Sequence, residues 1–284
     1  MKDEQSIQNL CLHTHNNYCD GKEDMNTLIK TAVSQQVAQI GISSHAPLRI
    51  KNSWSMEYNQ LDSYTSEVER LKKLYKGKIE IFKSLEIDFI PNKTYSFDFF
   101  RKRMKLDYTI GSIHLVLHSE KDKLWFIDGA KKSCIDSMME IFDGNVKRAV
   151  KSFFAQTREM IQTQKPDIIG HLDKVLMNTA HLFDINELWY QQEIIQTLEL
   201  IRDQNIIIEV NTRGLYKGKW KEPFPSINTL QQCFEMGIPI TISSDAHHSS
   251  ELLLNYQETR DIIKKIGFQY LQGRKNGKWG NFPI

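Results

Sequence analysis

The sequence predicts an α/β fold in which parallel strands alternate with helices and form a barrel. Short β-branched or apolar runs alternate with amphipathic stretches along the chain, which is the pattern of βα units on a parallel sheet. There are seven such runs, and a parallel barrel typically occupies about 250 residues. We therefore expect a single domain over residues 1–284, with a Gly-rich, basic C-terminal extension from about residue 268.

The expected strands are short, and each is bounded by polar or turn-forming residues. In chain order they are SIQNLCLH, AQIGISSH, IEIFKSLE, LDYTIGSIH, PDIIGH, NIIIEVN and PITISSD, beginning at residues 6, 38, 79, 106, 166, 205 and 239. Runs of this length that are rich in Ile and Val are typical of strands buried in a parallel sheet.

Two of the helices expected between these strands have clear apolar stripes. The first begins near Asp24, and its stripe is Met25, Leu28, Ile29, Ala32 and Val33. The second begins at Asn186, and its stripe is Leu188, Ile194, Ile195, Leu198 and Ile201. Residues at helical spacing form one face of a helix, so we expect both stripes to pack in the core.

The composition is that of an ordinary globular protein, with 40% hydrophobic and 25% charged residues. The formal net charge is +2 and the basic residues are scattered, which favours neither a nucleic-acid groove nor a membrane patch. The N-terminal MKDEQSIQNL is polar, and no later stretch approaches the roughly 20 apolar residues of a membrane span. We expect a cytoplasmic protein that binds neither nucleic acid nor membrane, and homo-oligomerisation remains open.

The four cysteines form no CxxC pair, and a chain of this length does not depend on disulfides, so we expect reduced thiols. Cys19 lies between His15 and Asp20 in the sequence. We interpret it as a small side chain in a loop, because a thiolate metal site usually brings a second cysteine nearby.

Histidines and carboxylates stand at or just after the ends of the expected strands. They are His13, His15, Asp20, His45, Glu86, His114, His171, Asp245 and His247. In a parallel barrel the carboxyl ends of all strands meet on one face, where barrel active sites lie. Alternate residues of an extended strand point to the same side, so HTH and SDAH each present two side chains together.

Imidazole and carboxylate ligands together suit Zn, Fe or Mn. Burying so many of them without cations would leave costly unpaired polar groups. Nine candidates are too many for one tetrahedral ion and suit two or three, and close metal pairs commonly clamp a phosphoryl group. His118, His181 and His248 are expected to be surface or hydrogen-bonded histidines instead.

With these motifs, the chain resembles the PHP (polymerase and histidinol phosphatase) metal-dependent phosphoesterases. The matching segments, in the family's order, are LHTHNNYCDG, ISSHAPL, KSLEIDF, GSIHLVL, IIGHLDKV, EVNTRGL and SSDAH, which span residues 12 to 247. Within the family the chain is similar to the stand-alone histidinol-phosphate phosphatases. This similarity rests on HAPL, on GSIH followed by FIDG, on QTREMIQTQKPDIIGHLD, and on NTRGL followed by FPS.

The resemblance implies a distorted (β/α)7 TIM-like barrel of the PHP type with two or three divalent metal ions. It implies one metal at His13, His15, Glu86 and Asp245, a second at Glu86, His114 and His171, and a third at Asp20, His45 and His247. Many relatives have a histidine one residue after the position of Asp20, where this chain has Gly21.

The resemblance also places phosphate-binding arginines at Arg158 in QTREM and Arg213 in NTRGL. A guanidinium fork suits phosphate geometry. Lys217 is a weaker candidate. Asp245, His247 or a water on the third metal would protonate the leaving group, and the sequence does not choose among them.

Three functions remain open from the sequence. The first is hydrolysis of L-histidinol phosphate in histidine biosynthesis, and the second is hydrolysis of another small phosphate ester, such as a nucleotide or sugar phosphate. The third is a non-catalytic metal-binding or polymerase-associated module. This third function is the least favoured, because polymerase PHP modules lie in far longer chains and because every ligand position here holds a competent residue.

Overall fold

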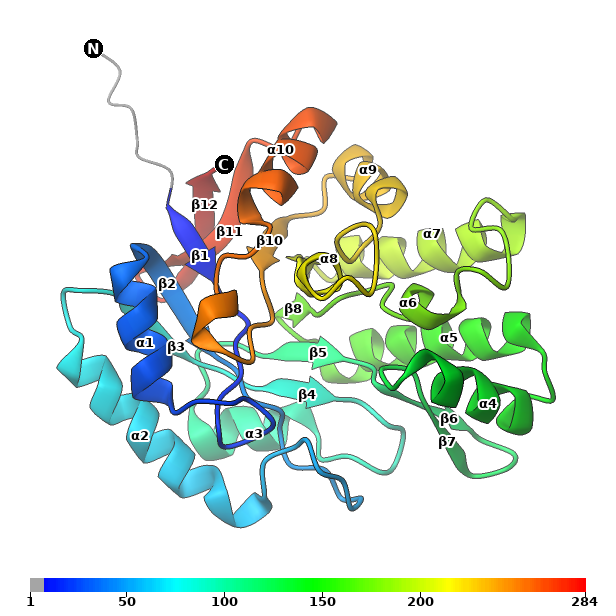
Figure 1. Ribbon diagram of the computed structural model, residues 1–284, viewed down its shortest axis with the longest axis horizontal. Helices are drawn as coiled ribbons and strands as arrows, with labels where there is room; N and C mark the ends of the chain where they lie inside the picture. The colour runs from blue at the N-terminus through cyan, green and yellow to red at the C-terminus, as the bar shows by residue number, and fades with distance from the viewer. Residues whose placement is uncertain (1–7) are drawn as a thin grey trace.

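The strands of the computed structural model, which describes residues 8–284, form two parallel sheets and two antiparallel hairpins (Figure 1). One parallel sheet has the order β1-β2-β3, at Asn9–Cys11, Val37–Ile42 and Glu80–Lys83. The other has the order β10-β9-β8-β5-β4, at Ile240–Ser243, Ile207–Asn211, Ile168–Ile169, Ile110–Ser112 and Glu86–Asp88. The hairpins are β6-β7, at Leu115–His118 and Lys123–Phe126, and β11-β12, at Tyr270–Lys275 and Lys278–Pro283.

The prediction of an α/β fold with parallel strands is confirmed, and each of the seven predicted runs contains a parallel strand. Residues 6 and 7 of the first run lie outside the described residues. The run from Ile79 contains β3 and ends at Glu86, the first residue of β4, which belongs to the other sheet. Two isolated parallel bridges, Thr14 with Ala246 and His45 with Glu86, connect the sheets beyond their regular pairing.

Helices surround the parallel sheets (Figure 1). They are α1 (Met25–Ser34), α2 (Leu61–Leu74), α3 (Phe97–Met104), α4 (Lys131–Ile141), α5 (Val146–Gln164), α6 (Leu176–Thr179), α7 (Leu188–Asp203), α8 (Arg213–Tyr216), α9 (Ile227–Glu235) and α10 (Tyr256–Ile266). The Asp24 side chain caps α1 by accepting a hydrogen bond from the backbone N–H of Thr27 at 3.0 Å, so the predicted start is confirmed. Within residues 8–284 no helix has the length and apolar character needed to cross a membrane.

The apolar stripe predicted for α7 is wrong at two positions. Leu188 is 80% exposed and Ile195 is 43% exposed, whereas Ile194, Leu198 and Ile201 are fully buried. Each helical residue is rotated by about 100° from the one before, so Leu188 and Ile195 lie roughly 120° and 100° away from Ile194 around the axis. The buried stripe is therefore narrower than the apolar letters suggest.

The C-terminal extension is a packed hairpin. The Trp279 ring of β12 lies against a small apolar cluster, and its centroid is 5.6 Å from that of Tyr108. Gln39 of β2 anchors the hairpin, since its side chain accepts from the backbone N–H of Arg274 at 2.9 Å and donates to the carbonyl of the same residue. The hairpin thus joins the same structural unit as the parallel sheets.

Candidate active site

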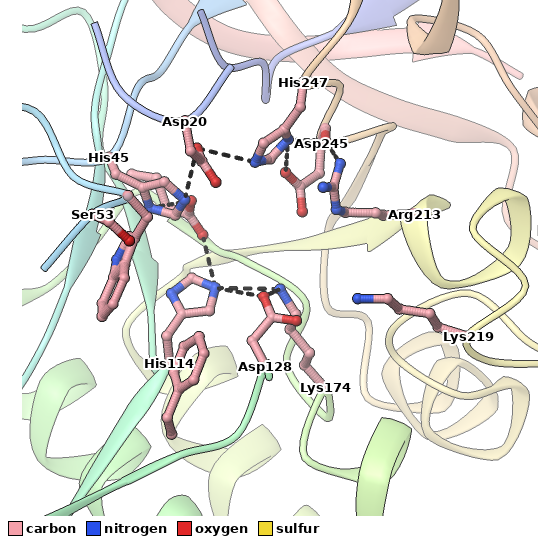
Figure 2. Close-up of a pocket in the computed structure, with 13 residues that line it drawn as sticks. Asp20, His45, Ser53, His114, Asp128, Lys174, Arg213, Lys219, Asp245 and His247 are labelled. Atoms are coloured by element: carbon pink, nitrogen blue, oxygen red, sulfur yellow. Dashed lines mark hydrogen bonds and ion pairs between the residues drawn. The ribbon is translucent and has the colours of Figure 1, made fainter. Parts of the chain in front are cut away.

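The nine predicted metal-ligand residues lie at or just beyond the carboxyl ends of the parallel strands. His13 and His15 follow β1, Asp20 precedes α1, His45 follows β2, Glu86 follows β3 as the first residue of β4, His114 follows β5, His171 follows β8, and Asp245 and His247 follow β10. Asp20, His45, Glu86, His114, Asp245 and His247 line a cavity of about 380 Å³ (Figure 2). The remaining three, His13, His15 and His171, are buried.

The Glu86 carboxylate lies at the centre of this cluster and is only 1% exposed. One oxygen is 3.2 Å from His13 Nε2 and 3.0 Å from His45 Nδ1. The other is 3.0 Å from His171 Nε2 and 3.8 Å from His114 Nε2. Glu86 therefore faces histidines from both parallel sheets.

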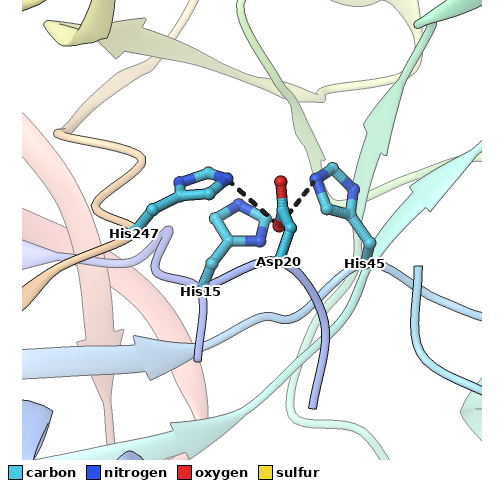
Figure 3. A group of neighbouring side chains, drawn as sticks. All are labelled: His15, Asp20, His45 and His247. Atoms are coloured by element: carbon cyan, nitrogen blue, oxygen red, sulfur yellow. Dashed lines mark ion pairs between the residues drawn. The ribbon is translucent and has the colours of Figure 1, made fainter. Parts of the chain in front are cut away.

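The donor atoms of the cluster fall into overlapping groups within which all atoms lie less than 4.8 Å apart. The groups are His15, Asp20, His45 and His247 (Figure 3); His13, His15 and Asp245; Glu86, His114 and His171; and His45, Asp88 and His114. The first three correspond closely to the three expected metal sites. The differences are that His15 also lies in the group of Asp20, and that Glu86 is grouped only with His114 and His171.

Two buried polar atoms in the cluster have no hydrogen-bond partner among the described residues. They are Asp20 Oδ1, which lies 3.2 Å from His247 Nε2, and His45 Nδ1, which lies 3.0 Å from Glu86 Oε2, and neither contact has hydrogen-bond geometry. Leaving such atoms unpaired is costly, and a cation would satisfy both of them. Imidazole nitrogens and carboxylate oxygens are the donors that Zn, Fe and Mn accept, so these residues fit divalent metals.

Two carboxylates that the sequence analysis did not select orient histidines of the cluster. Glu209 Oε1 is 2.7 Å from His13 Nδ1, and Asp88 Oδ1 is 2.9 Å from His114 Nδ1. Metal-binding histidines commonly donate their other ring N–H to such a carboxylate. The available signal was a carboxylate among apolar strand residues, Glu209 in IIIEV and Asp88 in EIDF.

Mutual charge interactions set the protonation of the cluster. Burial lowers the pKa of His13, but Glu209 and Glu86 outweigh it and raise this pKa well above its ordinary value. Burial raises the pKa of Glu86, but His45 and His13 hold it well below the usual range. His13 likewise depresses the pKa of the buried Asp245. The carboxylates are therefore ionised, and a cation would compete with a proton at His13. Burial lowers the pKa of His15, His45 and His171, which favours their neutral, metal-binding form.

Three cationic side chains line the cavity. Figure 2 shows Arg213, Lys174 and Lys219 around it. Arg213 Nη1 donates to the carbonyl of Asp245 at 2.7 Å, and Lys174 Nζ is 2.6 Å from Asp128 Oδ2. Lys219 has no carboxylate within salt-bridge distance among residues 8–284. The sequence analysis missed Lys174 and Lys219, although Lys174 lies three residues after His171 in the motif GHLDK.

The expectation that Arg158 binds phosphate is corrected by its position. Arg158 lies on α5, where its Nη2 is 2.8 Å from Glu193 Oε2 and its Nη1 is 3.2 Å from Thr197 Oγ1 on α7. It is not among the residues that line the cavity. Because α5 packs against α7, this side chain connects the two helices.

Lys217, the weaker candidate for phosphate binding, forms an ion pair with Glu251 and is not among the residues that line the cavity.

The residues that the sequence analysis set aside lie outside the donor groups. Cys19 Sγ is 3.5 Å from His15 Nδ1, yet Cys19 belongs to none of the groups found in the described residues. His118 is buried against Phe142, and His248 is half exposed and pairs with Glu23. All four cysteines have free thiols.

A buried carboxyl supports the loop that carries His171. Asp173 Oδ2 accepts from the backbone N–H of Ser226 at 2.8 Å, its other oxygen has no partner within the described residues, and burial raises its pKa to about 7. The folded state thus binds this proton more tightly than the unfolded state, so the unfolding free energy falls as pH rises from about 4 to about 7.

We expect Asp173→Asn to be more stable than the wild type above pH 7, by up to about 4 kcal/mol, and to lose this advantage towards pH 4. Urea unfolding at pH 5, 6, 7 and 8 measures the difference, with the exposed Asp203→Asn as control. A difference that does not change with pH would show that the carboxyl is not held protonated.

Residues 12–213 of the chain match the PHP domain family. A Schizosaccharomyces pombe protein named probable histidinol-phosphatase is 25% identical over an alignment of 292 residues including gaps. The alignment covers 96% of this chain and 89% of that protein. The histidinol-phosphatase of Bacillus subtilis is 24% identical over 260 residues, which cover 86% of this chain and 96% of that protein.

Among solved structures, the fold is similar to that of histidinol phosphate phosphatase from Lactococcus lactis subsp. lactis, complexed with zinc, L-histidinol and phosphate. The TM-score is 0.70 at 20% sequence identity, and the superposition covers 97% of this chain and 100% of the other. Since the family match extends over more than half of the sequence, with the donor residues gathered at one cavity, this chain belongs to the PHP domain family.

Proposed function

We propose that this protein is a metal-dependent phosphomonoesterase that hydrolyses L-histidinol phosphate to L-histidinol and phosphate. The observation that carries the proposal is a single cavity that joins the nine-residue donor cluster to three cationic side chains. A phosphate monoester carries close to two negative charges at neutral pH. Its hydrolysis therefore needs both bound metal ions and cationic side chains around the phosphate. The names of the relatives support L-histidinol phosphate as the substrate.

The size of the cavity favours a small ester. Its volume of about 380 Å³ is near the lower end of the range of roughly 300 to 1,000 Å³ for ligand pockets. A nucleotide, with a base and a ribose, fills more of that range than an amino alcohol phosphate does. The cavity is therefore large enough for an amino alcohol phosphate.

In this proposal the donor groups hold two or three ions of Zn, Fe or Mn. His13, His15 and Asp245 would hold one, His114 and His171 would hold a second, and Glu86 lies close to both sets. Asp20, His45 and His247, with His15 at their edge, hold the third. When bound, these ions supply Lewis-acid stabilisation of the phosphoryl oxygens and lower the pKa of water.

The side chains around the cavity perform the remaining tasks. Arg213 and Lys219 neutralise the phosphoryl oxygens, and Lys174 adds charge beside His114. The depressed pKa of Asp245 keeps this carboxylate ionised, which suits a ligand and not a proton donor. His247, which also lines the cavity, would be the better candidate to protonate the leaving alkoxide when it does not hold the third ion.

We also propose that the two parallel sheets are parts of one distorted seven-stranded barrel within a single domain, in which β3 and β4 count as one interrupted strand. The bridge between Thr14 and Ala246 links β1 to the end of β10. The bridge between His45 and Glu86 links the end of β2 to β4, which belongs to the other parallel sheet. The packed C-terminal hairpin supports the single domain.

A phosphate-release assay tests the function. The purified protein is expected to carry more than one equivalent of Zn, Fe or Mn, and chelation is expected to abolish turnover. Among L-histidinol phosphate, a sugar phosphate and a nucleoside monophosphate, the first should have the highest kcat/KM. Full activity with at most one metal equivalent would contradict the multinuclear site, and a preference for another ester would replace the substrate.

A further inference from the structure

Two aromatic side chains from separate segments meet at the edge of the cavity. Trp54 belongs to the connection between β2 and α2, and Phe126 is the last residue of β7. Their rings stack, with centroids 5.2 Å apart and planes inclined by 14°, and both residues line the cavity. We call Trp54 and Phe126 together the aromatic wall. Phe126 is 36% exposed and Trp54 is half-buried, so the wall retains accessible ring surface.

Hydrogen bonds hold Trp54 in place from its own loop. The Asn52 side-chain oxygen accepts from the backbone N–H groups of Trp54 at 3.0 Å and Ser55 at 2.8 Å. Its amide nitrogen donates to the carbonyl of Ile50 at 3.1 Å and to Ser55 Oγ at 2.9 Å. An asparagine that closes its own turn in this way gives the loop a defined shape.

Phe126 is fixed relative to the donor cluster by strand pairing. It pairs with Leu115 in the β6-β7 hairpin, and the next residue, Ile127, donates its backbone N–H to the carbonyl of His114 at 3.0 Å. A Cβ at Gly129 would lie 3.3 Å from the Phe126 ring, so this glycine leaves room for the ring. The position of the aromatic wall relative to His114 is therefore fixed.

The cavity has two chemically different sides. In Figure 2, Ser53, the neighbour of Trp54, lies across the cavity from Arg213 and Lys219. His45 lies beside Ser53 and Asp245 beside Arg213, with Asp20 between the two sides. A substrate whose phosphate faces the cations would extend its other end towards the aromatic wall.

We propose that Trp54 and Phe126 form the subsite that binds the leaving group of the ester through a flat ring. This inference rests on the proposed function and extends it, because it assigns the residues that distinguish an aromatic or heteroaromatic amino alcohol phosphate from an aliphatic one. Imidazole is such a ring, and stacking on Trp and Phe favours flat, polarisable groups in an offset arrangement. The subsite determines specificity and takes no part in breaking the phosphate ester.

The test compares two substrates that differ only in the ring. L-Histidinol phosphate and L-alaninol phosphate share the phosphate, the amine and the connecting carbons. Trp54→Ala and Phe126→Ala are each expected to lower kcat/KM for the first by about 10-fold, mainly through KM, because stacking stabilises ground and transition states alike. Both variants should remain within about 2-fold of wild type on the second. Trp54→Phe should retain part of the kcat/KM that Trp54→Ala loses.

Tyr58→Ala is the matched control, because Tyr58 lies in the same connection and stacks on Tyr95 and Phe99 but does not line the cavity. Equal losses on both substrates, or no loss on either, would overturn the subsite. If the wild type does not hydrolyse L-histidinol phosphate, the proposed function fails, and L-phenylalaninol phosphate then replaces it in the comparison. The ratio of ring-bearing to ringless substrate still tests the aromatic wall on its own.

Discussion

Replacing Glu86 with Gln is expected to lower kcat for L-histidinol phosphate by on the order of 10³-fold, the largest effect of any single substitution proposed for this protein. The carboxylate is buried at the centre of the donor cluster and faces histidines from both parallel sheets. Glutamine has nearly the same shape but no charge. It therefore removes the negative charge that two neighbouring cations would share, a contribution of several kcal/mol.

The comparison with Asp20→Asn tests the central position of Glu86. Asp20 touches only the group with His45 and His247, and its side chain is 31% exposed, so we expect a loss of about 10-fold. Glu80→Gln, an exposed change on β3, is the control for the same substitution. Steady-state kinetics, elemental analysis and thermal unfolding should be measured on all three. Equal losses for Glu86→Gln and Asp20→Asn would argue against a bridging carboxylate.

Replacing Arg213 with Ala is expected to lower kcat/KM by roughly 10- to 150-fold, because a charge-assisted hydrogen bond to phosphate contributes about 1.5 to 3 kcal/mol. The guanidinium lines the cavity and is oriented by the Asp245 carbonyl and by Tyr216 Oη at 3.2 Å. Lysine at this position should restore only part of the loss, since an ammonium lacks the two-pronged geometry. Metal content should not change.

Arg158→Ala provides the contrast. Arg158 pairs with Glu193 between α5 and α7, so its loss should lower the unfolding free energy by about 1 to 3 kcal/mol while kcat/KM stays near the wild-type value. Kinetics and urea unfolding on both alanine variants distinguish the two roles. If Arg213→Ala kept wild-type efficiency, the phosphate would have to be bound without this arginine.

Much of this protein could be predicted from local features of the sequence. The alternation of short apolar runs with helical stripes indicated parallel βα units, because strand and helix periodicities differ. The histidines and carboxylates after those runs were expected to converge, since the carboxyl ends of parallel strands meet at one face. His13, Glu86 and His171 illustrate this, because 73 and 85 residues of chain separate neighbours that lie about 3 Å apart.

Only the tertiary structure decided whether a charged or aromatic side chain points into the cavity or away from it. Arg158 matched a motif, yet the packing of α5 on α7 directs it to Glu193 and away from the cavity. Lys219 and Trp54 had no distinguishing local pattern, and the motifs FIDG and GHLDK that contain Phe126 and Lys174 did not reveal that their side chains reach the cavity. These residues line the cavity because loops and a hairpin bring them there. The sequence by itself determined which residues end the strands, since that depends on local periodicity and spacing. Which other charges and rings reach the site depends on contacts between segments distant in the chain, and no local pattern encodes those contacts.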